Sequence, residues 1–328
     1  MNHRSYRPHT VVATQHPDVS VVVPTYNRPE RLIRSIESIR SQTVDDVEIV
    51  VVDDHSEVPV AEMIEEADLD DPWLSVYRHD SNQNAAAARN TGISNARGEW
   101  VAFLDDDDEW QPTKLDRQLD AVQGADAGAV YTGVEQCRDG ATIATKRPDI
   151  EGEILPALLR RNFIGTTSTL LARRELLESI GGFDPELPSW QDWDLYLRLA
   201  DQTGFRVVPA ALTIQHSHDS NQMSDEYPTK RDVTVPRMRE KHRSKAAVYG
   251  VEAEFEATLA AELGWSALDA SEFSEARRHF YRSVKTHPTI ERLAMMLVTV
   301  GGGRGLAVGR LAKQLLPRGY KFKRSRPW

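Results

Sequence analysis

The segment FLDDDDEW, residues 103–110, sets four consecutive aspartates directly behind a run of apolar residues. Neighbouring like charges are costly, because carboxylates that no cation offsets raise one another's pKa. Four together therefore indicate either a turn exposed to solvent or a bound cation. Hard divalent ions such as Mg²⁺ and Mn²⁺ take oxygen ligands, and Mg²⁺ typically uses one or two carboxylates together with substrate phosphates. We interpret the cluster as part of a cation site, with the solvated turn as the alternative.

Upstream of this segment the pattern is that of a strand, a helix and a strand. VSVVVPTYN (19–27) is a β-branched run, typical of a strand buried on both faces of a parallel sheet. PERLIRSIESIRSQ (29–42) spaces its apolar residues by three and four, which predicts an amphipathic helix that begins at a proline. VEIVVVDDHS (47–56) is a second buried strand that ends in acids. The three form a βαβ unit, whose crossover should be right-handed.

The alternation continues up to the aspartates. We expect a helix over 61–68, a strand over 73–79, an alanine-rich helix over 85–96 and a strand over 100–104. Such a pattern predicts an α/β fold, a three-layer sandwich that binds ligands at the carboxyl ends of its strands. The acidic pair Asp53 and Asp54 and the cluster Asp105 to Asp108 both follow such strand ends, so they should converge on one crevice.

Further elements follow the aspartates. We expect a helix over 112–122, a strand over 127–137, a strand, a helix and a Gly-Gly turn over 168–187, a helix over 191–204, and a final strand pair over 205–218.

Beyond about residue 229 the sequence is almost wholly helical in character. Residues 263–288 match the offsets of a single tetratricopeptide repeat, with Leu263, Gly264, Ala276, Phe280 and Pro288 at its marked positions. One copy cannot form a solenoid, so we interpret it as a helical pair that packs on the body of the protein. Binding of a partner protein is the alternative.

Charge and composition exclude several classes of function. The chain has 328 residues and a formal net charge of −10, which argues against a nucleic-acid partner. Cys137 is the single cysteine, so an intrachain disulfide and a cysteine-rich zinc site are excluded. The N-terminus lacks the apolar core of a signal peptide, and no stretch of 18 uninterrupted apolar residues occurs. A cytoplasmic location fits these features. The acidic surplus and the preference for arginine over lysine resemble proteins of salt-loving organisms.

The C-terminal segment differs sharply from the rest. Residues 304–328 hold eight basic residues and no acidic one, so the remainder of the chain carries −18. Leucines and aromatic residues alternate with these basic residues, as in an amphipathic segment drawn to an anionic membrane surface. A solvated tail is the alternative.

Four segments, in order and at ordinary spacing, together resemble a family 2 glycosyltransferase with the GT-A fold, the Rossmann-like fold of nucleotide-diphospho-sugar transferases. They are VSVVVPTYNRPERLIRSIESIRSQT (19–43), EIVVVDDHS (48–56), AARNTGISNARGEWVAFLDDDDEWQPTKLDRQ (87–118) and WQDWDLYLRL (190–199). The resemblance implies a nucleotide-sugar donor, most commonly a UDP-sugar, a glycan or lipid-linked acceptor, and inversion at the anomeric carbon. It also implies Mn²⁺ or Mg²⁺ as the cofactor.

The resemblance assigns roles to individual residues. Pro24, Thr25 and Tyr26 match the turn that cradles the base, and Asp54 matches the acid that binds it. Asp105, Asp106 and Asp107 match the DxD motif, in which the first two contact the ribose and Asp107 holds the metal. Arg89 matches an arginine near the donor, with a surface salt bridge as the alternative. Asn84 stands where the family commonly has glycine, and asparagine tolerates the positive φ that this loop requires.

Asp192 matches the family's catalytic base, which takes the proton of the acceptor hydroxyl as that oxygen attacks. Asp194 is its rival; residues two apart on a helix point in nearly opposite directions, so only one of them can face the crevice. Neighbouring Trp193 should pack. His218, with His216 as the alternative, matches a histidine that serves several relatives as a metal ligand or phosphate contact. Trp110 and Trp190 could form platforms for sugar rings or pack in the core.

We therefore predict three regions. These are a flexible tail (1–17), a GT-A domain (18–225) with a donor half (18–110) and an acceptor half (111–225), and a helical C-terminal region (226–328). Two other functions stay open. A sugar-phosphate nucleotidyltransferase shares the ligands, but it would need a glycine-rich loop after the first strand, and VVVPTYNRPE has no glycine. An inactive scaffold that binds partners through the helical repeat is the second.

Overall fold

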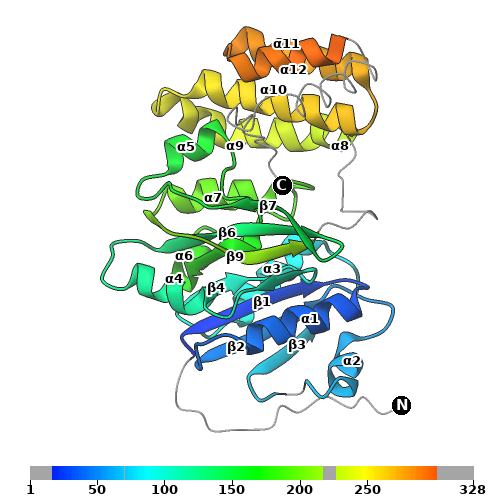
Figure 1. The fold of residues 1–328 in the computed structure, drawn as a ribbon, viewed down its shortest axis with the longest axis vertical. Coiled ribbons are helices and arrows are strands. Elements are labelled where there is room, and N and C mark those ends of the chain that lie inside the picture. Colours follow the sequence, from blue (N-terminus) through cyan, green and yellow to red (C-terminus); the bar gives the residue numbers. More distant parts are fainter. Residues whose placement is uncertain (1–16, 70, 217–226, 301–328) are drawn as a thin grey trace. The chain divides into compact units, whose positions relative to one another are not determined.

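The structure is a computed structural model that describes residues 17–69, 71–216 and 227–300. His218 and the basic residues from Arg304 onward lie outside the described residues. The chain divides into two compact units (Figure 1). The first comprises residues up to 154, 164–185 and 198–220, and the second comprises 155–163, 186–197 and 221 onward. This division differs from the sequence boundary at 225, because two segments of the predicted acceptor half pack with the C-terminal helices.

The first unit is built on one mixed sheet. Its strands are β1 (Val19–Thr25), β2 (Val47–Asp53), β3 (Leu74–Arg78), β4 (Trp100–Phe103), β5 (Asp108–Trp110), β6 (Ala129–Arg138), β7 (Ala141–Lys146), β8 (Leu170–Arg173) and β9 (Phe205–His216). Their order is β3-β2-β1-β4-β8-β6-β9-β5, with β7 beside β6. The four strands expected before the aspartates are all present, and β1 lies between β2 and β4 in parallel register.

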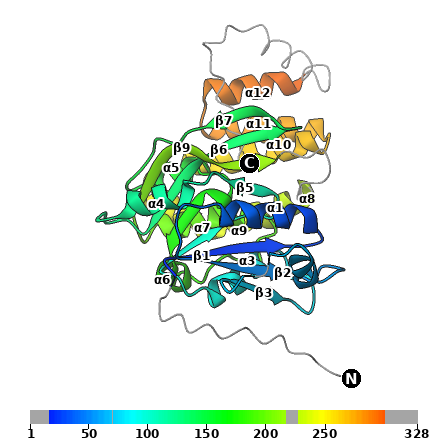
Figure 2. The same cartoon turned by 60° about the horizontal axis from the view of Figure 1, so that its bottom comes forward.

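Helices cover both faces of this sheet (Figure 2). They are α1 (Pro29–Arg40), α2 (Val60–Glu66), α3 (Ala85–Asn95), α4 (Lys114–Val122) and α6 (Arg174–Ser179). Val21 of β1 packs in one buried core with Ile36 of α1 and Leu115 of α4. Val22 points to the opposite face, where a Cβ placed on Gly92 of α3 would lie 2.2 Å from its Cγ1. The predicted three-layer α/β sandwich is confirmed.

The second half of the sheet departs from the sequence prediction. β8 runs antiparallel between β4 and β6, so the sheet is mixed rather than parallel. The expected strand pair over 205–218 is instead the single strand β9, which stays continuous through Pro209 because it shifts register against β6. The short strands β5 and β7 were not predicted.

The second unit is helical. Its elements are α5 (Leu155–Arg160), the first two turns of α7 (Gln191–Ala200), α8 (Tyr227–Thr229), a π-helical turn (Lys230–Thr234), α9 (Val235–Val248), α10 (Glu252–Asp269), α11 (Phe273–Thr286) and α12 (Ile290–Val300). The helical pair expected around residues 263–288 is α10 and α11. Gly264 accommodates the ring of Phe280, three of whose atoms would lie 2.9 Å from an added Cβ. Within the described ranges, none of the helices combines the length and apolarity needed to cross a bilayer.

Candidate active site

Three neighbouring strands of the first unit end at the predicted donor residues. Pro24 and Thr25 end β1, Asp54 directly follows β2, and Asp105 lies two residues after β4. Because β1 pairs with both other strands in parallel, the three ends lie at one edge of the sheet. Tyr26, the next residue after β1, is 46% exposed. The structure thus brings together the predicted donor residues of the first unit.

Arginines, rather than water alone, offset the charge of the acidic turn. Thr25 Oγ1 donates to Asp106 Oδ2 at 2.8 Å, and Arg28 Nη1 lies 3.1 Å from both Asp106 Oδ1 and Asp107 Oδ2. Arg31 Nη1 lies 3.7 Å from the same oxygen of Asp107. The sequence pointed only to solvent or a bound cation as the partner of these charges, and neither arginine was predicted to take part.

The two arginines do not fully offset the burial of the carboxylates and the repulsion between them. Burial, opposed by Arg28, raises the pKa of Asp106 to about 6. Burial and the neighbouring Asp105 raise the pKa of Asp107 as well, although Arg28 and Arg31 act against the shift. The turn therefore holds carboxylates that would gain from a further cation.

Asp105 connects the turn to a different helix. Arg89 of α3 places Nη2 2.6 Å from Asp105 Oδ1, and its guanidinium carbon lies 5.3 Å from the centre of the Phe183 ring. The arginine side chain is only 12% exposed, so this ion pair is largely buried rather than a surface salt bridge. Thr166 Oγ1 also donates to Asp105, at 3.2 Å.

Asp108, the fourth aspartate, is buried and anchors the turn through hydrogen bonds. It is 2% exposed, and its Oδ2 accepts from Ser168 Oγ at 2.6 Å. The same Ser168 oxygen accepts from the backbone N–H of Asp105 at 3.1 Å, and the carbonyl of Ser168 accepts from Trp110 Nε1 at 2.8 Å. Trp110 is 3% exposed and therefore packs in the core instead of offering a sugar platform. Nothing in the sequence around Ser168 marked it as a partner of the aspartates.

The Asp54 carboxylate is held on both oxygens. Oδ1 lies 2.7 Å from His79 Nδ1 and accepts from the backbone N–H of Gln83 at 2.9 Å. Oδ2 accepts from the backbone N–H of Asn84 at 2.9 Å. Asp54 thereby ties the end of β2 to the loop that leads into α3.

Asn84 adopts the backbone conformation expected for it. Its φ is 79°, and its side-chain oxygen accepts from the backbone N–H groups of Ala86 and Ala87 at 2.9 and 3.3 Å. The positive φ expected at this position is present. Asparagine also supplies an N-cap to α3, which glycine could not do through a side chain.

The second unit holds the predicted base and its rival. Asp194 is fully buried, and its Oδ1 lies 2.7 Å from Lys241 Nζ and 2.8 Å from His242 Nε2. Asp192 is partly exposed, and its Oδ2 accepts from Asn162 Nδ2 at 2.9 Å. Of the two acids, Asp192 is therefore the one with access to solvent.

The remaining aromatic and histidine residues divide between core and surface. Trp193 is 2% exposed, as expected, and donates from Nε1 to the carbonyl of Leu158 at 2.9 Å. Trp190 is partly exposed and has a positive φ of 59°. In the first unit, His216 Nε2 lies 2.6 Å from Glu109 Oε1.

The acidic turn offers carboxylate oxygens, the ligands that hard divalent cations take. Among the described residues no group of three or more His, Cys, Asp or Glu side chains could hold a metal ion by itself. Mg²⁺ typically takes one or two protein carboxylates when substrate phosphates complete its shell. Asp107 would be suited to such a role, because its side chain is 23% exposed and its pKa is raised.

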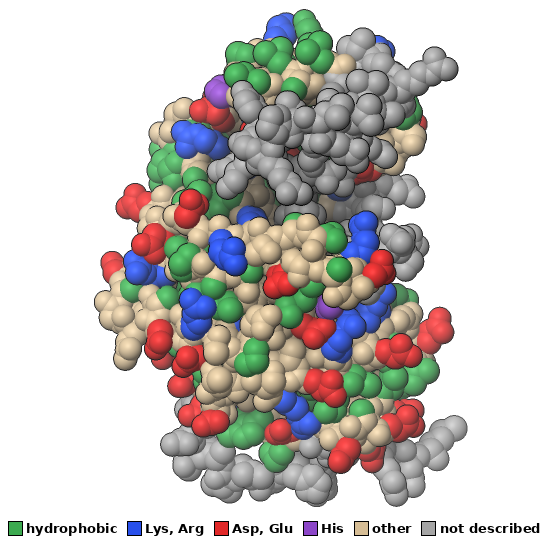
Figure 3. Space-filling view, in the orientation of Figure 1, with side chains coloured by type: hydrophobic (Ala, Val, Ile, Leu, Met, Phe, Trp, Pro, Cys, Tyr) green, Lys and Arg blue, Asp and Glu red, His purple; other side chains and the backbone are tan. Residues whose placement is uncertain are grey.

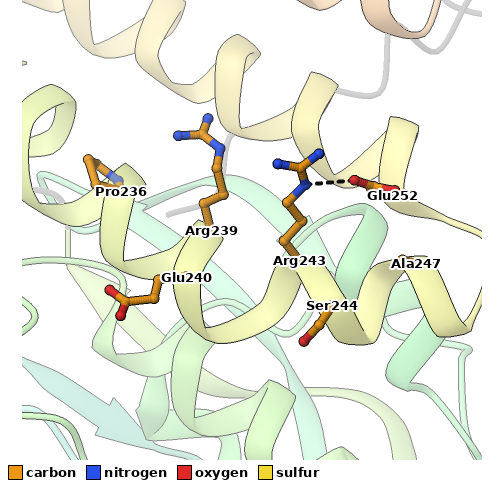
Figure 4. A pocket seen from close by; sticks show the side chains of 7 residues that line it. All are labelled: Pro236, Arg239, Glu240, Arg243, Ser244, Ala247 and Glu252. Carbon is orange, nitrogen blue, oxygen red and sulfur yellow. Dashed lines mark hydrogen bonds and ion pairs between the residues drawn. The ribbon is translucent and has the colours of Figure 1, made fainter.

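A separate hollow of about 530 Å³ lies in the second unit between α9 and the start of α10. Figure 4 shows Arg239 and Arg243 reaching from α9 toward α10, while Glu240 points away. Both arginines are paired, Arg243 with Glu252 at 2.6 Å and Arg239 with Glu256 at 2.7 Å. None of the predicted site residues lines this hollow.

Comparison with known proteins gives a family match and similar relatives. Residues 20–181 match the model described as Glycosyl transferase family 2. The amylovoran biosynthesis glycosyltransferase AmsB of Erwinia amylovora is 31% identical over 210 residues, 61% of this chain and 69% of AmsB. The matches span 63% to 84% of the length of the first three curated relatives.

Solved structures share the fold. S. aureus TarS 1-349 in complex with UDP-GlcNAc has a TM-score of 0.61 at 18% identity, over 92% of this chain and 93% of that one. The mannosyltransferase PcManGT from Pyrobaculum calidifontis in complex with GDP-Man and Mn²⁺ has a TM-score of 0.56 at 19% identity, over 92% and 84%. At these identities the likeness shows the fold alone.

Proposed function

The chain belongs to glycosyl transferase family 2, and from that premise we propose that it transfers a sugar from a nucleotide-diphosphate donor to a hydroxyl of a glycan or lipid-linked acceptor. Transfer inverts the anomeric carbon and depends on Mn²⁺ or Mg²⁺. UDP-sugars are the preferred donor class, since a structural neighbour is a complex with UDP-GlcNAc. We infer a role in polysaccharide biosynthesis because the similar protein AmsB is an amylovoran biosynthesis glycosyltransferase.

The observation that carries this proposal is the crowding of aspartates at one strand edge. Departure of a nucleoside diphosphate builds negative charge on the leaving group, and a divalent cation neutralises that charge without a proton. Asp107, with its raised pKa, is the residue that holds the cation. Asp105 and Asp106 bind the ribose, and Pro24, Thr25, Tyr26 and Asp54 surround the base.

Arg89 has a supporting role in the same proposal. It is fixed by its ion pair with Asp105 and by the face of Phe183. A guanidinium held in this way is ready to contact a phosphate or the sugar without losing side-chain entropy on binding.

Asp192 is the proposed general base. It accepts the proton of the acceptor hydroxyl while that oxygen attacks the anomeric carbon from the face opposite the leaving group. The hydrogen bond that Asn162 donates to Asp192 fixes the orientation of its carboxylate, and the residue stays partly exposed. Asp194 is fully buried between two basic side chains, so it has a structural role.

A screen of UDP- and GDP-sugars tests the function directly. We expect one donor class to bind only when Mn²⁺ or Mg²⁺ is present. Asp107→Asn should lose this metal-dependent binding. Turnover with a glycan or lipid-linked acceptor should release free nucleoside diphosphate. Release of pyrophosphate would instead indicate a nucleotidyltransferase, and absence of nucleotide binding would indicate a scaffold.

The proposal includes contact with an anionic membrane through the C-terminal end. Residues 273–328 contain thirteen basic and two acidic residues in a chain of net charge −10. Arg277, Arg282 and Lys285 are exposed on α11. On α12, three apolar side chains form an exposed stripe: Ile290 at 84%, Leu293 at 40% and Leu297 at 64%. Figure 3 shows hydrophobic side chains gathered over α11 and α12.

Positive charge beside an exposed apolar stripe is what binds an anionic bilayer surface. The test is co-sedimentation of the full chain with vesicles that contain phosphatidylglycerol or only phosphatidylcholine. Leu293→Glu with Leu297→Glu should weaken binding to the anionic vesicles by roughly tenfold or more, since each buried leucine side chain contributes about 1.5–3 kcal/mol. Val248→Glu is the matched control, because Val248 is 83% exposed but lies on α9. Unchanged binding in the double variant would contradict the membrane surface.

A further inference from the structure

Arg28 contacts two aspartates of the acidic turn, and no role was predicted for it from the sequence. One nitrogen, Nη1, lies 3.1 Å from Asp106 Oδ1 and 3.1 Å from Asp107 Oδ2. Arg31 is a second, more distant cation, with its Nη1 3.7 Å from the same Asp107 oxygen. A positive charge therefore already bridges two of the carboxylates that the proposed function assigns to the donor and the metal.

The local sequence fixes this placement. Arg28 is the N-cap residue of α1, and Pro29 begins the helix. Arg31 lies three residues further along, on the same side of the helix surface. Since β1 ends at Thr25, the chain between strand and helix is short, and it brings both arginines to the strand edge where the aspartates lie.

A guanidinium and a divalent cation cannot share these oxygens without cost. Both carry positive charge, and at a separation of a few ångströms in a partly buried site the repulsion is strong. The Asp107 side chain is 23% exposed and that of Arg28 is 32% exposed, so solvent does not fully screen the contact. Binding of the metal at Asp107 therefore requires Arg28 to move away or to find a new anion.

A nucleoside diphosphate supplies that anion. Arginine forms strong bidentate hydrogen bonds to phosphate, and the flexible side chain allows a change of partner without a change of backbone. A phosphate that arrives together with the metal compensates both the lost ion pair and the added positive charge.

We propose that Arg28, assisted by Arg31, takes the place of the divalent cation while the donor site is empty and transfers to the diphosphate when the donor binds. This inference rests on the proposed function and deepens it. It implies that the metal binds weakly to the free protein and tightly only with the nucleotide, because the two ligands are coupled through one side chain.

The test measures Mn²⁺ alone and then UDP. Binding of Mn²⁺ to the full chain without nucleotide is followed by the electron paramagnetic resonance signal of free Mn²⁺, and UDP binding at saturating Mn²⁺ by calorimetry. Arg28→Met should raise the affinity for Mn²⁺ alone by about tenfold or more, since one nearby positive charge is removed. The same variant should weaken UDP binding by about tenfold, since a charged hydrogen bond to phosphate is lost.

Two further variants separate this role from a merely structural one. Arg28→Lys keeps the charge, so it should leave the weak binding of Mn²⁺ alone unchanged. Arg40→Met removes a comparable cation from the same helix, one paired with Asp71 at 3.4 Å, and should change neither affinity.

If Arg28 moves from the aspartates to the diphosphate, Arg28→Met should raise the affinity for Mn²⁺ alone and lower the affinity for UDP. Tight binding of Mn²⁺ alone by the wild type, or an Mn²⁺ affinity that Arg28→Met leaves unchanged or lowers, would overturn the inference. A wild type that binds no nucleotide under any metal condition would refute the proposed function, whereas the measurements with Mn²⁺ alone would still decide the role of Arg28.

Discussion

Asp192 and Asp194 illustrate how surroundings separate two identical side chains on one helix. Asp194 is enclosed and paired with Lys241 and His242, whereas Asp192 is partly exposed and held by Asn162. Residues two apart on a helix point in nearly opposite directions, and the sequence favoured Asp192 over Asp194 only through its resemblance to the family. The sequence did not reveal which of the two acids is buried. That distinction depends on α9, more than forty residues further along the chain.

Replacement of the two acids should separate catalysis from stability. Asp192→Asn is expected to abolish sugar transfer while donor binding and the melting temperature stay unchanged. Asp194→Asn leaves the partly exposed Lys241 without its buried counter-ion, and it should lower the free energy of unfolding by roughly 3 kcal/mol. Steady-state kinetics and denaturant unfolding check the two results. Turnover retained by Asp192→Asn would remove its assignment as the base.

Asn84 allows a second test at the level of one residue. Asn84→Ala loses the N-cap bonds and places a β-carbon at a φ of 79°, so the free energy of unfolding should fall by about 2 kcal/mol. Asn84→Gly loses the same bonds but relieves the strain, and it should change stability by less than about 0.5 kcal/mol. Urea titrations of both variants check the prediction, which equal losses would contradict.

The residues that sequence reasoning missed have a common feature. Arg28, Arg31 and Ser168 contact the aspartates through side chains, yet none of them belongs to an acidic or histidine-rich pattern. Ser168 is separated from Asp108 by sixty positions, so only the folded sheet reveals their contact. The aspartates themselves stood out because four like charges in a row are rare enough to require a reason.

At the level of elements, α4 buries a lysine at its first residue. Lys114 is completely buried, its Nζ donates to Gln118 Oε1 at 2.7 Å and lies 3.8 Å from the centre of the Trp110 ring. Burial lowers the pKa of Lys114 well below its usual value. The folded protein therefore holds this amine neutral at a pH where the unfolded chain binds a proton.

This lysine should leave a signature in the pH dependence of stability. Because the unfolded state binds one more proton than the folded state, the free energy of unfolding rises with pH until the pH passes the unfolded pKa near 10.4. In the pH range just below the unfolded pKa, the wild type should gain stability relative to Lys114→Met, with a slope of at most about 1.4 kcal/mol per pH unit. Guanidinium unfolding across that range measures the difference, and parallel curves would show that Lys114 is charged in the folded state.

Helices and strands were predicted correctly where the spacing of apolar residues was regular. The prediction failed where strands distant in sequence pair with one another. The first two strands before the aspartates, β1 and β2, are rich in β-branched residues, and all four strands before the aspartates were found. The antiparallel insertion of β8 could not be predicted, because a buried apolar run looks the same in either direction. β9 was predicted as a strand pair, but it is one strand that shifts register against β6 and continues through Pro209.

At the scale of the whole molecule, charge is distributed very unevenly along the chain. The chain is acidic overall, yet basic residues outnumber acidic ones thirteen to two over positions 273–328. A uniform salt-adapted surface would not concentrate cations in this way. The asymmetry suits a protein that is repelled by anionic surfaces over most of its length and attracted at one end.

Salt should therefore weaken vesicle binding in a characteristic way. The Debye length falls from about 10 Å at 0.1 M salt to about 3 Å at 1 M, which screens the attraction between basic side chains and anionic lipid. Binding to phosphatidylglycerol vesicles should decline steeply across this range, while the affinity for UDP with Mn²⁺ should change less. Co-sedimentation at stepped NaCl concentrations measures the effect. Vesicle binding that does not respond to salt would favour a purely apolar contact.

The central position of β8 also limits how this enzyme can be recombined with its relatives. Since β8 pairs with β4, a chimera cut after residue 110 would have to pair β4 of one parent with the corresponding strand of the other. Chimeras that fold should have their crossover beyond residue 173, so that β4 and β8 come from the same parent. The residues proposed to bind the nucleotide could then not be exchanged without β8.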